Sequence, residues 1–225
     1  MRTCKTARSS ITRTFCWSRT YARQGGQSRP GLPIKCGVAV IHQTRQLSRY
    51  AIPLRSLPRA ARLADAPILA TISLEVWLGT YLRRGISTFF AEYALQEFTA
   101  KRFAAALRAP DEHFIVSEND EGLDGFIRVS QGRVAPVSSC STTEISTLYV
   151  RPGQHGRAIG TSLLKQRLDF AQTLGAASVW LATNAGNLPA IAFYLKHGFR
   201  QVGTTQFRIQ DQAYPNLVFS RALDA

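Results

Sequence analysis

Acidic residues are absent from the first 64 positions of this 225-residue chain. Residues 1–64 carry 13 Lys and Arg side chains and no Asp or Glu, whereas residues 65–225 carry 15 basic and 14 acidic side chains. The net charge of +14 therefore belongs almost wholly to the N-terminal segment. Because nonspecific binding to nucleic acid depends on clustered positive charge, we do not expect the nearly neutral remainder of the chain to bind nucleic acid.

The N-terminal segment also lacks a hydrophobic period. Residues 1–52 are rich in Arg, Ser and Thr, which predicts a disordered extension before a folded domain at residues 53–225. Three interpretations remain open: a mitochondrial transit peptide, a basic arm that contacts nucleic acid, or a segment that is not part of the natural product. The third interpretation stays open because Met1 is the only methionine. A start assigned too far upstream could therefore not be corrected at an internal Met codon.

Cysteine and histidine are few and scattered. The chain has four of each, without a C-x-x-C pair or an H-x-x-x-H spacing, so we expect no metal site and a reducing, cytoplasmic compartment. No run of about 18 apolar residues occurs, so we expect no membrane-spanning segment. What remains is a globular domain in a chain that is 45% hydrophobic, which is enough for a sizeable core.

Hydrophobic periodicity predicts an alternation of helices and strands in the second segment. A short strand is expected near the start, followed by two helices, the first of them capped by Asp65. Three strands, a helix, a strand, a helix and two more strands follow. This order predicts an α+β chain of about seven strands and about four helices. The expected helices lie at residues 68–82, 89–109, 157–175 and 188–198, and the later strands at 112–119, 122–132, 142–150, 177–183, 199–203 and 214–223.

Glycines gather where the strand at residues 142–150 leads into the helix at residues 157–175. The stretch LYVRPGQHGRAIGTSLL follows neither the G-x-x-x-x-G-K-[ST] pattern of a P-loop nor the G-x-G-x-x-G pattern of a dinucleotide site. Free N–H groups and the dipole at a helix N-terminus nevertheless favour an anion such as a pyrophosphate, and small residues would let it approach the backbone. An ordinary strand-to-helix turn is the alternative.

Two segments resemble the GCN5-related N-acetyltransferase (GNAT) family. The loop HGRAIG, residues 155–160, is similar to the family's acetyl-CoA loop Q/R-x-x-G-x-G/A, and Asn187 to Phe199 follows N-x-x-A-x-x-F-Y-x-x-x-G-F. The loop departs from the pattern at His155 and at Ala158, where glycine is usual. Alanine would cost little there if the backbone stays helical, since only a residue with positive φ demands glycine. The resemblance covers roughly residues 55–222 and implies the GNAT fold, with a mixed, mostly antiparallel sheet.

The resemblance implies a site for acetyl-CoA as co-substrate. The pantetheine would lie between two parallel strands that separate after a bulge, and the pyrophosphate would sit on the loop amides. Thr161 could donate a hydroxyl, Arg157 could add a charge-assisted contact, and Asn187 would hold the pantetheine or cap the following helix. The implied coenzyme-binding residues are Leu148, Tyr149, Val150, His155, Gly156, Arg157, Ala158, Ile159, Gly160, Thr161, Asn187, Ala190 and Phe193.

The same resemblance implies two catalytic residues. Tyr194 would be the general acid that protonates the departing thiolate; the alternative is that it packs beside Phe193. Glu144 would be the base, acting through water, and burial would raise its pKa; the alternative is a surface carboxylate. Strict alternation would place Glu144 on the same face as Leu148 and Val150.

The end of the chain resembles the bacterial polyamine (spermidine/spermine) acetyltransferase branch, which implies a small primary amine as the acceptor. It would bind between the first two helices and the last hairpin. Two alternatives remain, a coenzyme-binding protein without turnover and an enzyme for protein or peptide amines, and a homodimer is compatible with either. The candidate acceptor residues are the acids Glu75, Glu92, Glu97 and Asp211 and the aromatics Trp77, Tyr81 and Phe89.

Overall fold

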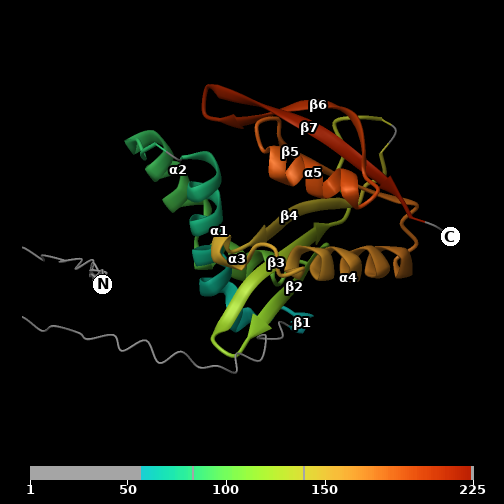
Figure 1. Cartoon of the computed structure of the whole chain (residues 1–225), viewed down its shortest axis with the longest axis horizontal. Coiled ribbons are helices and arrows are strands. Elements are labelled where there is room, and N and C mark those ends of the chain that lie inside the picture. The colour runs from blue at the N-terminus through green and yellow to red at the C-terminus, as the bar shows by residue number, and fades with distance from the viewer. Residues whose placement is uncertain (1–56, 83, 139, 224–225) are drawn as a thin grey trace, which may run out of the picture. The chain divides into compact units, whose positions relative to one another are not determined.

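A computed structural model of the chain describes residues 57–82, 84–138 and 140–223 (Figure 1). The expected extension at residues 1–52 lies outside the described residues. Within them, seven strands form one sheet in the order β1-β2-β3-β4-β5-β7-β6. The strands are β1 (Leu57–Ala60), β2 (Glu112–Asn119), β3 (Gly122–Ser130), β4 (Glu144–Val150), β5 (Ser178–Asn184), β6 (Arg200–Ile209) and β7 (Gln212–Ala222).

All neighbouring strands are antiparallel except β4 and β5, which are parallel. The predicted mixed, mostly antiparallel sheet of seven strands is therefore confirmed. Strands β6 and β7 are longer than expected because a tight turn at Gln210 and Asp211 continues their pairing to Ile209 and Gln212. Gln210 has a positive φ of 52°, which periodicity does not reveal.

The described residues hold five α-helices rather than four, because the helix expected over residues 89–109 is broken. Phe98 leaves the helical region, with φ −95° and ψ 72°, and Thr99 then begins a new helix by accepting a hydrogen bond from the Arg102 N–H at 3.2 Å. The helices are α1 (Ala66–Tyr81), α2 (Thr88–Glu97), α3 (Ala100–Ala106), α4 (Ile159–Thr173) and α5 (Leu188–Lys196).

Asp65 precedes α1 as expected, but its carboxylate does not cap the helix. It accepts hydrogen bonds from the Arg59 guanidinium at 2.8 and 3.0 Å and from the Arg62 N–H at 2.7 Å. The Arg59 guanidinium holds the pKa of the Asp65 carboxyl below its usual range. Asp65 therefore ties the end of β1 to the start of α1.

The helices cover the two faces of the sheet with separate cores. On one face α1 packs through Leu69 and Ile72 on the buried Phe126 of β3. On the other face α4 packs through Leu163 and Leu164, and α5 completes the cluster with Tyr194. Since both cores meet β4, the position of this strand is fixed from both sides.

One helical stretch among the described residues, Leu63–Tyr81, is long and apolar enough to cross a membrane by length and composition alone. Within the protein 39% of it is buried, and core helices of soluble proteins meet the same criteria. Because Leu69 and Ile72 pack this stretch on the sheet, the finding is weak support for a membrane span. The expected absence of membrane contact stays a prediction.

Candidate active site

Strands β4 and β5 meet at one pair of residues and then separate. Glu144 pairs with Trp180, and the Trp180 N–H donates to the Thr143 carbonyl at 3.0 Å. In the described part of the chain no later residue of β4 pairs with β5, which continues along β7 instead. The parallel strands therefore diverge toward their carboxyl ends.

Backbone groups of β4 are left without a strand partner along this fork. A Cβ built on Gly125 of β3 would lie 2.8 Å from the Tyr149 carbonyl oxygen, so that carbonyl faces β3. Because successive residues of a strand present their N–H and C=O groups to opposite edges, those of Leu148 and Val150 face the β5 side. These are the groups expected to pair with the pantetheine.

A bulge at Ser146 overturns the expected alternation of β4. Arg128 pairs with Thr147 and Val129 pairs with Ile145, so Ser146 has no opposite residue on β3. This extra residue moves the side chains of β4 on its two sides to opposite faces of the sheet from those that strict alternation gives. Glu144 therefore shares a face with Thr147 and Tyr149, which packs with Phe126 under α1, while Leu148 and Val150 pack under α4.

The loop between β4 and α4 is held by its own side chains and by two residues with positive φ. The His155 Nε2 donates to the Val150 carbonyl at 2.9 Å. Gly156 has φ 80° and Ala158 has φ 61°. The condition under which alanine would cost little, a helical backbone at Ala158, is therefore not met. A left-handed conformation is one that alanine adopts at a cost of about 1–2 kcal/mol, which explains why glycine suits this position.

The N-terminus of α4 has no capping side chain. Ser162 donates the first helical hydrogen bond to the Ala158 carbonyl at 2.9 Å, which leaves the N–H groups of Ile159, Gly160 and Thr161 without helical acceptors. These N–H groups and the helix dipole favour an anion. A Cβ at Gly160 would lie 3.5 Å from the Phe193 ring, so this glycine also brings α4 close to α5.

His197 connects α5 to this helix terminus. Its Nδ1 donates to the Phe193 carbonyl at 2.7 Å, and its Nε2 lies 3.1 Å from the Thr161 hydroxyl. With the proton on Nδ1, a neutral His197 can accept from Thr161 through Nε2. No pattern in the sequence singles out His197 as a site residue. Its contact with Thr161 joins residues that are 36 positions apart.

Asn187 lies where α5 begins and serves two partners. Its side-chain oxygen accepts from the Ala190 N–H at 3.3 Å, as an N-cap does. Burial raises the pKa of the Tyr81 hydroxyl, and its interaction with the Asn187 side chain opposes that rise. Of the two roles expected for Asn187, helix capping is the one this structure contains.

Tyr81 of α1, Tyr149 of β4 and Tyr194 of α5 lie close enough for their charges to interact, and Tyr93 of α2 also acts on Tyr149. Tyr194 is buried, and its ring lies 5.4 Å from Phe193 between centroids. Burial raises the pKa of Tyr194, and a charge on Tyr81 would raise it further. Burial likewise raises the pKa of Tyr149, with additional contributions from Tyr81, Tyr93 and Tyr194. Each phenol therefore stays protonated at neutral pH and can donate a proton.

A network of polar side chains around the buried Glu112 adjoins Glu144. The carboxylate of Glu112 accepts hydrogen bonds from Arg128 at 2.7 Å, from Arg133 at 2.6 Å and from Ser130 at 2.6 Å. Burial raises the pKa of Glu144, while the charges of Arg133 and Arg128 oppose that rise. Sequence reasoning did not select Glu112, because a glutamate at the start of a strand resembles an ordinary surface residue.

The expected acceptor residues divide into paired and unpaired carboxylates. Glu75 pairs with Arg151 at 2.7 Å, and Glu97 pairs with Arg102 at 3.3 Å. Glu92 and Asp211 form no ion pair with another described residue. The expected aromatic residues belong to one cluster of rings. Between ring centroids, Trp77 lies 5.7 Å from Tyr81 and 6.0 Å from Phe90. The Phe90 centroid lies 5.2 Å from that of Phe89.

Within residues 57–82, 84–138 and 140–223, no three His, Cys, Asp or Glu side chains gather as metal ligands would. The expectation that the reaction needs no metal stays a prediction. Cys140 is a free cysteine.

Residues 79–199 match the model of the acetyltransferase (GNAT) family. An uncharacterized N-acetyltransferase of Mycobacterium bovis is 32% identical over 119 residues, which cover 53% of this chain and 72% of that protein. The N-alpha-acetyltransferase RimI of Mycobacterium tuberculosis is 33% identical over 102 residues, 45% of this chain and 60% of that protein. Streptothricin acetyltransferase of Streptomyces lavendulae is 33% identical over 95 residues, 42% of this chain and 48% of that protein.

Solved structures share the fold at lower sequence identity. The PaiA N-acetyltransferase of Thermoplasma acidophilum, crystallised with coenzyme A, superposes with a TM-score of 0.61 at 18% identity and covers 75% of this chain and 99% of that one. A GCN5-related N-acetyltransferase of Rhodopseudomonas palustris superposes with a TM-score of 0.60 at 20% identity and covers 76% of this chain and 98% of that one.

Proposed function

We propose that this chain, which belongs to the acetyltransferase (GNAT) family and like its relatives is an acyltransferase, transfers an acetyl group from acetyl-CoA to the primary amine of a small molecule. The observation that carries the proposal is the fork between β4 and β5 beyond Glu144 and Trp180. This fork lies beside the uncapped N-terminus of α4, so a strand edge and an anion site occur together.

The chain's own groups fit the parts of acetyl-CoA. The pyrophosphate would accept hydrogen bonds from the N–H groups of Ile159, Gly160 and Thr161. The pantetheine amides would pair with the backbone of Leu148 and Val150, where His155 already occupies the Val150 carbonyl. Acetyl-CoA binding would therefore require His155 to release that carbonyl or the pantetheine to use the remaining groups.

The chemistry needs a base for the amine and an acid for the thiolate. The amine nitrogen attacks the thioester carbonyl, its proton passes through water to Glu144, and the C–S bond breaks as Tyr194 donates a proton to sulfur. The raised pKa of Glu144 suits a base that works near neutral pH. The raised pKa of Tyr194 keeps its hydroxyl available as a donor.

For the acceptor, a polyamine is the first candidate. Glu92 and Asp211 are the two expected acids that no described arginine neutralises, and each could pair with a cationic amine. The ring cluster around Trp77 could add cation–π contacts. A peptide N-terminus is the second candidate, favoured by the 33% identity with the N-alpha-acetyltransferase RimI.

The test combines a thiol-release assay with an acceptor panel of spermidine, spermine, amino acids, aminoglycosides, streptothricin and N-terminal peptides. Release of coenzyme A that depends on one acceptor class identifies the substrate. Tyr194→Phe removes one oxygen and keeps the ring, so kcat should fall by about 10² to 10⁴ while acetyl-CoA affinity is retained.

Tyr149→Phe is the matched comparison, because it removes a second buried hydroxyl from the same cluster. Its effect on kcat should be less than about tenfold. An equal loss in both variants would assign the effect to the cluster and not to an acid at Tyr194. Coenzyme binding without transfer to any member of the panel would favour a protein that binds acetyl-CoA without turnover.

A further inference from the structure

Arg167 is a buried cation on the face of α4 that packs against the sheet. It is 5% exposed, although its neighbours on that face are apolar residues such as Leu163 and Leu164. Its Nε has no hydrogen-bond partner in the described part of the chain. The guanidinium carbon lies 4.6 Å from the centroid of the Phe170 ring, which offers no acceptor oxygen. A charge buried without a counterion is costly.

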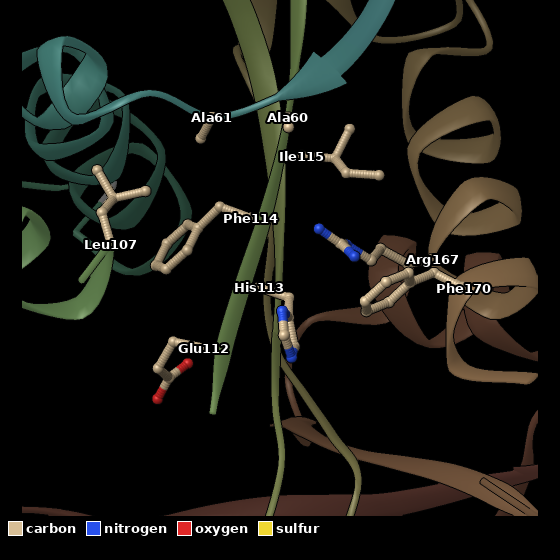
Figure 2. Close-up of a pocket in the computed structure, with 9 residues that line it drawn as sticks. All are labelled: Ala60, Ala61, Leu107, Glu112, His113, Phe114, Ile115, Arg167 and Phe170. Carbon is tan, nitrogen blue, oxygen red and sulfur yellow. The ribbon is translucent and has the colours of Figure 1, made fainter. Parts of the chain in front are cut away.

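No carboxylate among the described residues forms an ion pair with Arg167. Glu112 is near, but Figure 2 shows its carboxylate turned away from the guanidinium, and Arg128 and Arg133 already hold it. Residues 1–56, outside the described part, contain no Asp or Glu. Burial lowers the pKa of Arg167 to about 10, so the side chain still carries its charge at neutral pH.

The guanidinium lies beside a cavity of about 360 Å³ at the edge of the sheet, around the start of β2. Its lining residues lie on both sides of β2: Arg167 is on the α4 side, and Glu112 is on the other side (Figure 2). Strand β1 ends at Ala60, opposite Ile115, so it does not extend along the first residues of β2. His113 also lines the cavity, with its ring centroid 5.0 Å from that of Phe170. The apolar lining consists of Ala60, Ala61, Leu107, Phe114, Ile115 and Phe170.

We propose that this cavity binds a small organic carboxylate with an apolar body, and that Arg167 pairs with the carboxylate. A guanidinium matches a carboxylate through two parallel N–H···O bonds. The apolar lining suits an aryl or alkyl group, and the volume lies at the lower end of small-molecule sites. Inorganic phosphate is less suited, because it carries more charge and cannot use the apolar walls.

The cavity does not include the residues expected to hold acetyl-CoA, although Glu112, which lines it, also belongs to the network beside Glu144. The start of β2 is two strands away from the fork at β4. The proposal therefore does not depend on the acetyl-transfer reaction, and its test needs no acetyl-CoA.

The full chain is titrated with phenylacetate and hexanoate, and with phenylacetamide and hexanamide as neutral controls of the same shape. Thermal melting and calorimetry measure the response. Because a ligand that binds the native state stabilises it, the carboxylates should raise Tm in a saturable way and the amides should not.

Arg167→Met keeps most of the side-chain volume and removes the charge, so carboxylate affinity should fall about tenfold or more. Arg108→Met is the control, because Arg108 is exposed and does not line the cavity. If Arg167→Met does not fold, Ala60→Phe provides a second test: it fills the cavity from β1, leaves Arg167 in place, and should abolish the response.

Several results would overturn the proposal. These are equal shifts with amides and carboxylates, carboxylate binding unchanged in Arg167→Met, or an Arg167-dependent shift with inorganic phosphate alone. Asp224 is the one acidic side chain outside the described residues. Carboxylate binding that occurs in Asp224→Asn and not in the wild-type chain would show that Arg167 has a partner within the protein.

Discussion

Glu144 and Trp180 are the residues at which β4 and β5 pair before the two strands separate. The pair lies close to the Ser146 bulge. The fork therefore begins near the point where the side chains of β4 switch between the two faces of the sheet. Glu144 is thereby held at the base of the fork, on the face of the sheet that α1 covers. A carboxylate placed there is partly buried and adjoins the strand edge that would receive the coenzyme.

Gly160→Asp should weaken acetyl-CoA binding by more than about tenfold, which corresponds to about 1.4 kcal/mol. The new carboxylate would accept hydrogen bonds from the α4 amides and repel the pyrophosphate that uses them. Calorimetry with acetyl-CoA measures the change. Gly160→Ala is the control, since its methyl group would meet Phe193 at an ordinary contact distance of 3.5 Å. Equal affinity for Gly160→Asp and the wild type would remove the loop from the coenzyme site.

Most strands could be predicted because alternation and apolar runs depend on neighbours in sequence. The expected strand at residues 112–119 matches β2. The bulge at Ser146 could not be predicted in this way, because it is a mismatch between two strands and leaves no mark on β4 alone. A single unpaired residue was enough to place Glu144 on the opposite face from Leu148.

The glycine-rich loop and the α5 motif were visible as patterns, but their contacts were not. Positive φ at Ala158 comes from how the loop connects β4 to α4, and the local sequence favours no such conformation for alanine. The cluster of Tyr81, Tyr149 and Tyr194 depends on three elements that meet only in the folded chain. The buried Arg167 interrupts an otherwise apolar helix face, and the periodicity that predicts this helix does not mark an arginine as buried.

Ala158→Gly should stabilise the protein by about 0.5–1 kcal/mol. Glycine removes the cost of the left-handed backbone, about 1–2 kcal/mol, and part of that gain is offset by its greater freedom in the unfolded chain. Urea unfolding measures the difference. Ala105→Gly in α3 is the control and should destabilise by roughly 0.5–1 kcal/mol, because Ala105 is exposed and helical. Destabilisation by Ala158→Gly would mean that the positive φ costs nothing in this loop.

Glu112→Gln should lower the free energy of unfolding by on the order of 3 kcal/mol at pH 7, because Arg128 and Arg133 lose their buried counterion. Burial alone would raise the pKa of Glu112, but hydrogen bonds from Arg128, Ser130 and Arg133 lower it overall. Its stabilisation is therefore present above the ordinary glutamate pKa and is lost as pH falls through the lowered one. Unfolding at pH 7 and pH 3 tests this, with the exposed Glu121→Gln as control.

Arg133→Gln should move the acidic limb of the kcat/KM profile to higher pH. Glu144 must be ionised to act as a base, so activity falls as pH drops through its pKa, and burial places that fall above the range of an exposed glutamate. The charge of Arg133 lowers the pKa of Glu144, so removing it raises that pKa. Removing it also leaves the negative charge of Glu112 less neutralised, which raises the pKa of Glu144 further. Rates measured from pH 5 to 9 give the limb, with Arg108→Gln as control. A limb that does not move, or that survives in Glu144→Gln, would assign the base to another group.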